Sequence, residues 1–415
     1  MAFIKPFNGI RYNLEKAVLK QVIAPPYDII SDKMRESLEI KSPYNIVRLL
    51  LPQGEDKYKN AKKILDSWLA EGVLIKDNKP CFYLYEQEYE VDGKKLSRTG
   101  IVGLVKLEEL GKENILPHER TLSSPIEDRF RLIKEVKANL SQVFSLYLDQ
   151  EKKMDRLFNY IKKNIPAASA VDDKGIKNSI WLITDDKDMH TLIEFMKDRK
   201  LYIADGHHRY VTALSYRNMR RANEGVSGNE LKDYDFIMMM MVNFYDDGLK
   251  VFPTHRVITI PDMFDRTKFI KCISKNFDIV ENVEDIGLFV SDTTVIKFVI
   301  YIDGKYHGLI LKDESLERLH PIYRKVNTFV LHELILKNCL FFDEDELSKS
   351  DRISYYHTID EVNKLVEQGK SIAFIVSPVD LEIIREIAEN NLYMPQKSTY
   401  FYPKLSSGLV IYKFE

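Results

Sequence analysis

Residues 201–210 read Leu-Tyr-Ile-Ala-Asp-Gly-His-His-Arg-Tyr and form a corner between a short apolar strand and a helix. Asp205 and Gly206 end the apolar run, and a helical stretch containing Ala and Leu follows directly. A helix N-terminus at such a corner presents unpaired backbone N–H groups and the positive end of the helix dipole, and glycine lets an anion approach closely. The next side chains add donors and charge: His207, His208 and Arg209. The corner therefore predicts a phosphate-binding site.

A structural alternative is that Asp205 only caps the helix and that neighbouring carbonyl groups satisfy both histidines. Two histidines and an arginine at consecutive positions are difficult to explain by packing alone. We therefore favour a binding site, although the motif by itself leaves the reaction open.

Alternating strands and helices flank this corner and indicate an α/β fold with mixed α+β sheets. We expect strands at 144–148, 180–183, 201–204 and 236–244, and helices at 153–161, 189–196 and 210–222. Upstream, we expect structured loops to residue 51, a helix at 56–70 and a hairpin of strands 82–91 and 100–107. Downstream, we expect a hairpin of strands 295–302 and 306–311, helices at 325–337 and 381–390, and strands at 372–376 and 408–412. Four consecutive methionines in 236–244 are predicted to pack in the core.

The length of 415 residues favours several domains, since single cores usually stop growing at about 250–300 residues. Soft boundaries near residues 110 and 245 give three regions. Residues 1–110 form an N-terminal α/β region with a hairpin, 111–245 contain the phosphate-binding core, and 246–415 form a C-terminal α+β region that completes the site.

Composition restricts the partners. The net charge of −2, from 61 basic and 63 acidic residues, disfavours binding to duplex nucleic acid. The sequence shows neither a secretory signal nor an apolar run long enough to cross a membrane, so we expect a cytoplasmic protein. Cys81, Cys272 and Cys339 lie far apart in apolar surroundings, and we expect all three to be reduced core residues. The oligomeric state stays open, a homodimer included.

A second polar cluster begins at His118 and continues through Glu119, Arg120 and Thr121 to Arg129. Glu119 is a candidate general base, and either arginine is a candidate phosphate clamp, because a guanidinium matches phosphate geometry. Asn139 and Ser141 follow later along the chain. A solvated loop and first helical turn is the alternative explanation for this cluster.

Further candidates for substrate contact occur in loops and strand ends. In the N-terminal region they are Tyr27, Asp28, Asn45 and Arg48, and further along they are His255 and Arg256. The loop at 394–404 offers Lys397, Ser398, Thr399, Tyr400 and Lys404, of which the two lysines are candidate phosphate contacts. Equally, the aromatic residues of this loop could cover a sheet end, and residues 255–256 could be a surface pair on an edge strand. Five histidines receive no role: His190, His307, His320, His332 and His357.

The set of motifs resembles the prokaryotic family known as domain of unknown function 1015. The resemblance covers nearly the whole chain, through the segments at 24–28, 43–49, 118–121, 128–129, 204–210, 255–256 and 397–404. The Asp-Gly-His-His-Arg segment is also similar to the phosphate-binding signature of the ParB and sulfiredoxin-like superfamily, which includes free-serine kinases. That resemblance implies a ParB-like nucleotide-binding core, ATP or ADP as phosphoryl donor, Mg²⁺, and Glu119 as the base. It further implies that His207, His208 and Arg209 contact the transferred group, while Asp205 orients a histidine or meets the metal.

Our first hypothesis is therefore a kinase that transfers a phosphoryl group to a small hydroxylated metabolite, with L-serine as the leading acceptor. Positioning and charge neutralisation are the main requirements of this chemistry. The alternative is a nucleotide-binding switch of ParB-like type without metabolite turnover. A phosphatase, or a sulfur-oxidation repair enzyme that would need a nearby cysteine, is a third hypothesis.

Overall fold

The hairpin around Asp92 and Gly93 lies at the centre of the larger sheet. Strands β4 (Phe82–Val91) and β5 (Lys94–Lys106) pair in antiparallel register, as predicted. Both turn residues have positive φ, 51° and 73°, which a two-residue hairpin turn of type I′ requires.

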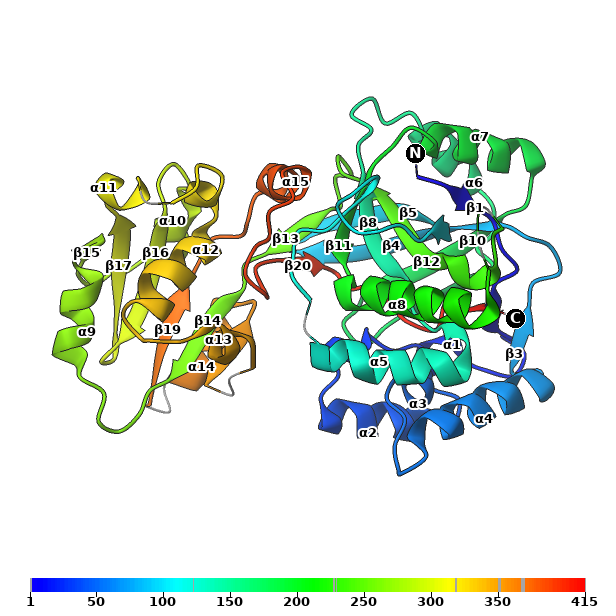
Figure 1. Cartoon of the computed structure of the whole chain (residues 1–415), viewed down its shortest axis with the longest axis horizontal. Coiled ribbons are helices and arrows are strands. Elements are labelled where there is room, and N and C mark those ends of the chain that lie inside the picture. Colours follow the sequence, from blue (N-terminus) through cyan, green and yellow to red (C-terminus); the bar gives the residue numbers. More distant parts are fainter. Residues whose placement is uncertain are drawn as a thin grey trace. The chain divides into compact units, whose positions relative to one another are not determined.

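The computed structural model, drawn in Figure 1, describes residues 2–121, 123–226, 228, 230–317, 319–349, 352–366 and 370–414.

The larger sheet has nine strands in the order β6-β11-β8-β12-β5-β4-β10-β9, and β1 pairs with β5. The remaining strands are β1 (Ile4–Lys5), β6 (Ile115–Leu116), β8 (Val143–Tyr147), β9 (Ala168–Val171), β10 (Lys177–Ile183), β11 (Leu201–Asp205) and β12 (Phe236–Asn243). Pairing is parallel between β6 and β11 and between β8 and β12, and antiparallel between the other neighbours. The mixed α/β class is therefore confirmed. The methionines of β12, Met238–Met241 in sequence, are fully buried in the core as predicted.

Helices stack beside this sheet. Helix α8 (His207–Glu224) packs against α5 (Ser123–Val136), and α5 packs against α4 (Lys57–Ala70), so that the three follow one another away from the strands (Figure 1). The opening segment, expected to be loops, also contains α2 (Asp32–Lys41), whose N-terminus is capped by the Ser31 side chain. Helix α2 was missed because most of its residues are polar and its apolar period is weak.

The chain divides into two compact units. Unit 1 comprises residues 1–117, 121–249 and 403–415, and unit 2 comprises residues 118–120 and 250–402. The predicted boundary at 110 falls inside unit 1, because the nine-stranded sheet uses strands from both sides of that position. The last residues return to unit 1, where β21 (Tyr412–Lys413) pairs with β7 (Ala138–Asn139).

Unit 2 has its own six-stranded antiparallel sheet in the order β15-β17-β16-β19-β14-β18. Its strands are β14 (His255–Thr259), β15 (Phe277–Val280), β16 (Lys297–Ile302), β17 (Lys305–Leu311), β18 (Ile353–Tyr356) and β19 (Ser371–Ile375). Strands β13 (Lys250–Phe252) and β20 (Tyr400–Tyr402) form a separate antiparallel pair. The predicted helix 325–337 is α12 (Asn327–Leu331) followed by the π-helix η4 (His332–Lys337). Helix α15 (Leu381–Glu389) is close to its prediction.

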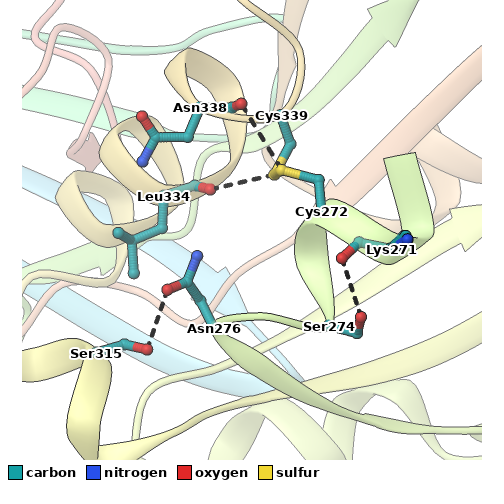
Figure 2. Close-up of a disulfide and its surroundings, with 8 residues drawn as sticks. All are labelled: Lys271, Cys272, Ser274, Asn276, Ser315, Leu334, Asn338 and Cys339. Atoms are coloured by element: carbon teal, nitrogen blue, oxygen red, sulfur yellow. Dashed lines mark hydrogen bonds between the residues drawn. A yellow bond between two sulfur atoms is a disulfide. The ribbon is translucent and has the colours of Figure 1, made fainter. Parts of the chain in front are cut away.

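The expectation of three reduced cysteines is wrong for two of them. Cys272, on α9 (Arg266–Ile273), forms a disulfide with Cys339, which follows η4, and their Cα atoms lie 5.7 Å apart (Figure 2). The pairing spans 67 residues and is invisible in the sequence, because only the fold brings α9 and η4 to one hydrophobic core. Cys81 is a buried free thiol, as predicted. Among the described helices, none is both long and apolar enough to span a bilayer.

Candidate functional site

The corner after β11 forms as the sequence predicts, except that the helix begins three residues earlier. Gly206 is the N-cap of α8, in the left-handed region with φ 93°, and it supplies no capping side chain. The first helical hydrogen bond runs from the Tyr210 N–H to the Gly206 carbonyl, at 3.0 Å. The backbone N–H groups that precede that of Tyr210 therefore lie at the N-terminus of the helix. A non-glycine residue at position 206 would adopt this backbone conformation only with strain.

Asp205 is held between two cations. Its Oδ2 accepts a hydrogen bond from Arg209 Nη2 at 2.7 Å, and its Oδ1 pairs with Lys404 Nζ. Burial by itself raises the pKa of Asp205, but Lys404 and Arg209 outweigh burial, with a further contribution from His207, and hold the pKa well below the usual carboxyl range. The structure thus brings together candidates that lie 199 residues apart in sequence.

This environment does not fit Asp205 as a magnesium ligand, because both of its oxygens already contact cations. Among the residues that the structure describes, no group of three or more His, Cys, Asp or Glu side chains is arranged to hold a metal ion. The geometry fits Asp205 instead as the group that orients Arg209.

The Arg209 guanidinium lies directly over Gly206. A Cβ placed on Gly206 would lie 2.8–2.9 Å from three guanidinium atoms of Arg209, closer than ordinary contact. Arg209 Nη1 also donates to the Gln142 carbonyl. The arginine is therefore fixed from two sides at the start of α8. The glycine beneath it adopts the left-handed conformation with little strain and leaves room for the guanidinium in this position.

A small cavity of about 60 Å³ lies beside this arginine in unit 1. Its polar lining consists of Tyr27, Arg129, Asn139, Ser141, Arg209 and Thr212. Thr212 is only 2% exposed, and its Oγ1 has no hydrogen-bond partner within the described part of the chain. Thr212 was missed, although it lies on α8 three residues after Arg209, a spacing that places both on one helical face.

Tyr27 and Arg129 form one wall of this cavity. The Arg129 guanidinium lies 4.4 Å from the centre of the Tyr27 ring, donates to the Leu50 carbonyl at 2.6 Å and pairs with Asp128 at 2.9 Å. Burial raises the pKa of Tyr27 to about 12. Tyr27 is therefore a neutral hydroxyl at physiological pH, and Arg129 adds a second guanidinium to the cavity that Arg209 lines.

Other predicted residues of unit 1 do not line this cavity. Asn45 is fully buried and serves the backbone, since its Nδ2 donates to the Gln21 carbonyl at 2.7 Å and its Oδ1 accepts from the Val47 N–H. Arg48 donates to the Glu39 carbonyl at 2.9 Å. Four predicted residues remain. His207 is buried and His208 is half-buried, both in the first turn of α8. Thr121 is half-buried and Asp28 is exposed.

In unit 2, Glu119 and Arg256 both contact the backbone of Lys397. Glu119 Oε1 accepts a hydrogen bond from the Lys397 N–H at 2.7 Å, and Arg256 Nη2 donates to the Lys397 carbonyl at 3.1 Å. Lys397 adopts a positive φ of 56°, which a non-glycine residue tolerates when its surroundings fix it. Arg256 is fully buried, and burial lowers its pKa to about 10.

The other unit 2 candidates are mostly engaged in packing. Ser398 is 2% exposed, donates to the Pro395 carbonyl and accepts from Thr328. His118 Nε2 lies 3.2 Å from Thr399 Oγ1. Tyr400 stacks on His357 with ring centres 3.5 Å apart.

Two unit 2 candidates differ sharply in exposure. His255 is buried, accepts a hydrogen bond from the Val376 N–H at Nδ1, and has its pKa lowered to about 4, chiefly by burial. Arg120 is exposed and lines a different cavity within unit 2.

Comparison with known proteins identifies the family. No curated protein sequence matches this chain. Among solved structures, a conserved hypothetical protein from Pyrococcus furiosus is 14% identical, with 71% of this chain and 89% of that chain covered and a TM-score of 0.36. A mutant free serine kinase in complex with ADP is 13% identical, with 70% and 84% covered and a TM-score of 0.37. SbnI from Staphylococcus aureus, truncated at its C-terminus, is 8% identical, with 73% and 84% covered and a TM-score of 0.37.

At these identities and TM-scores, the similarity assigns no residue role to this chain. The family model is more decisive, because it matches residues 4–329 and so includes the α8 corner and the Glu119 segment. The chain belongs to the protein family of unknown function DUF1015.

Proposed function

We propose that the α8 corner binds a nucleotide phosphate and that the protein is a nucleotide-dependent phosphotransferase acting on a small hydroxylated metabolite. L-serine is the leading acceptor, and ATP or ADP is the donor. The observation that carries the proposal is the fixed position of Arg209 over Gly206, at a glycine-capped helix start. Helix N-termini and guanidinium groups both stabilise phosphate oxygens, and prior fixation reduces the reorganisation needed in the transition state.

The charges around the corner support this proposal. Asp205 neutralises part of the charge of Arg209 and Lys404 and holds both in place, so the corner is oriented before a ligand arrives. Arg129 brings another guanidinium to the cavity that Arg209 lines. Several oriented cations and helix N–H groups provide the charge neutralisation that phosphoryl transfer requires. The sequence motif shared with free-serine kinases points to the same class of reaction.

Glu119 is our proposed base for the acceptor hydroxyl. Its Oε1 is fixed by the Lys397 N–H, and Arg256 interacts with it electrostatically. A positioned carboxylate accepts a substrate proton when the acceptor hydroxyl comes within about 3 Å of it. Glu119→Gln preserves the shape of the side chain and removes its basicity, so it tests this role directly.

The experiment uses the full chain with Mg²⁺, ATP or ADP, and a panel of hydroxylated metabolites that includes L-serine. Nucleotide binding is followed by calorimetry and phosphorylated product by mass spectrometry. We expect Arg209→Ala and His207→Ala to weaken nucleotide binding at least tenfold, on the order of one lost charge-assisted hydrogen bond. Arg131→Ala, an exposed arginine paired with Glu127, is the matched control and should bind normally.

Three outcomes separate the hypotheses. Product that disappears in Glu119→Gln while nucleotide binding persists supports the kinase and its base. Nucleotide binding without product from any acceptor overturns the kinase and leaves the nucleotide-dependent switch. Equal nucleotide affinity in Arg209→Ala and wild type overturns the phosphate site itself.

A further inference from the structure

Unit 2 contains a cavity of about 320 Å³ that is separate from the α8 corner. The lining side chains that matter here are Arg120, Tyr323, Phe329, His332, Tyr393 and Met394. This volume is within the range of small-molecule sites, which combine an apolar wall with a few polar groups. The cavity combines these features in one unit, so it requires no contribution from unit 1.

His332 is the buried polar group of this cavity. It is the first residue of the π-helix η4 and is 5% exposed, and its Nε2 has no hydrogen-bond partner among the described residues. Burial, together with Arg256 and Lys337, lowers the pKa of His332 well below its usual value, so the imidazole is neutral at physiological pH. A neutral imidazole nitrogen donates or accepts depending on its tautomer, and a ligand hydroxyl satisfies either case.

Arg120 is the available cation. The isolated bridge between Glu119 and Met394 places the Arg120 segment beside the Tyr393 segment, and the guanidinium lies 5.8 Å from the centre of the Tyr393 ring. Lys337, the other cation of the lining, pairs with Glu333 and, at 2.6 Å, with Glu344, and both glutamates also line the cavity. Arg120 forms no ion pair with a carboxylate in the described part of the chain, so it is the group that can receive an anion.

Two aromatic side chains form the apolar wall. The rings of Tyr323 and Phe329 are stacked, with centres 3.9 Å apart and planes within 5°. The Tyr323 hydroxyl donates to the Tyr393 carbonyl at 3.0 Å and accepts from the Tyr393 N–H at 3.2 Å. Because that hydroxyl is already used, the wall offers aromatic surface, which favours a planar ligand.

We propose that this cavity binds a small aromatic carboxylate that also carries a hydroxyl group. The carboxylate pairs with Arg120, the ring lies against the aromatic wall, and the hydroxyl hydrogen-bonds to His332. The proposal does not depend on nucleotide binding, because every residue that carries it belongs to unit 2.

Three probes test each part of this assignment on the full chain by calorimetry. The probes are 4-hydroxyphenylacetate, phenylacetate, which lacks the hydroxyl, and 4-hydroxyphenylacetamide, which lacks the charge. We expect the first to bind best and the other two to bind about tenfold more weakly each, the order expected for one lost hydrogen bond or charge pair.

Two variants assign the contacts. Arg120→Gln should abolish the preference for acid over amide and keep the preference for the hydroxyl. His332→Phe should do the reverse, with retained phenylacetate binding as evidence that the unit is folded. Arg266→Gln, an exposed arginine of α9 outside the cavity, is the control and should match wild type. Absence of binding by all three probes to wild type, or preferences unchanged in both variants, would overturn the proposal.

Discussion

Lys404 forms a buried ion pair with Asp205 from a position 199 residues further along the chain. The pair links the end of the sequence to the α8 corner, and Arg209 completes it on the other carboxylate oxygen. All three side chains are at most 15% exposed. Asp205→Asn would leave two poorly hydrated cations without their carboxylate, so we expect the free energy of unfolding to fall by about 3–5 kcal/mol.

Urea denaturation of the full chain, followed by circular dichroism, measures this loss. Glu127→Gln removes the carboxylate of an exposed pair with Arg131 and should change the free energy by less than about 1 kcal/mol. A similar small change in Asp205→Asn would contradict the view that the corner depends on this carboxylate.

A comparison of Gly206→Ala with Gly175→Ala separates the effect of backbone strain from the effect of crowding at the corner. Any Cβ there meets a positive φ of 93° and the Arg209 guanidinium at 2.8–2.9 Å. Gly175→Ala is a matched control, because Gly175 has φ 78° but open space where its Cβ would be. We expect both variants to lose about 1–3 kcal/mol of stability from strain, while only Gly206→Ala also weakens nucleotide binding, because it displaces Arg209. Thermal unfolding and calorimetry measure the two effects, and normal nucleotide affinity in Gly206→Ala would contradict the view that binding needs Arg209 in its position over Gly206.

The sequence was informative wherever one local pattern determined the structure. The Asp92-Gly93 turn, the helix of α4 and the buried methionines of β12 each depend on neighbouring residues, and all three were predicted. The Asp205 corner was also predicted as a strand-to-helix turn, because glycine between a strand and a helix is a local signal.

Contacts between distant segments were beyond local patterns. The Lys404–Asp205 pair depends on the return of residues 403–415 to unit 1, which no spacing in the sequence encodes. Thr212 was overlooked because a threonine within an amphipathic helix has no motif of its own, and only the cavity beside Arg209 distinguishes it. The unit 2 position of Glu119 likewise depends on its bridge to Met394.

The disulfide between Cys272 and Cys339 predicts a redox-dependent stability of unit 2. It closes a segment of 67 residues, and loss of such a bond typically costs about 2–4 kcal/mol. We expect dithiothreitol to lower the unfolding free energy of wild type and to leave the Cys272→Ser/Cys339→Ser variant unchanged. Thiol titration of the denatured, unreduced chain should find Cys81 alone, whereas detection of all three thiols would contradict the bond.

His255 predicts a loss of stability in mild acid. Its pKa is lowered to about 4 in the folded chain, against about 6.5 for an unfolded histidine, so the unfolded state binds one more proton between these values. The contribution of neutral His255 to the free energy of unfolding is therefore fully present above pH 6.5 and is lost as the pH falls towards 4, by up to about 3 kcal/mol.

The variant His255→Asn keeps an acceptor for the Val376 N–H but does not titrate, so its stability should fall less steeply over this range. Since His332 also has a lowered pKa and contributes to the slope of both proteins, the decisive quantity is the difference between wild type and variant. Urea denaturation from pH 7.5 to 4.5 measures that difference, and parallel curves would show that His255 is already protonated, or exposed to water, in the folded chain.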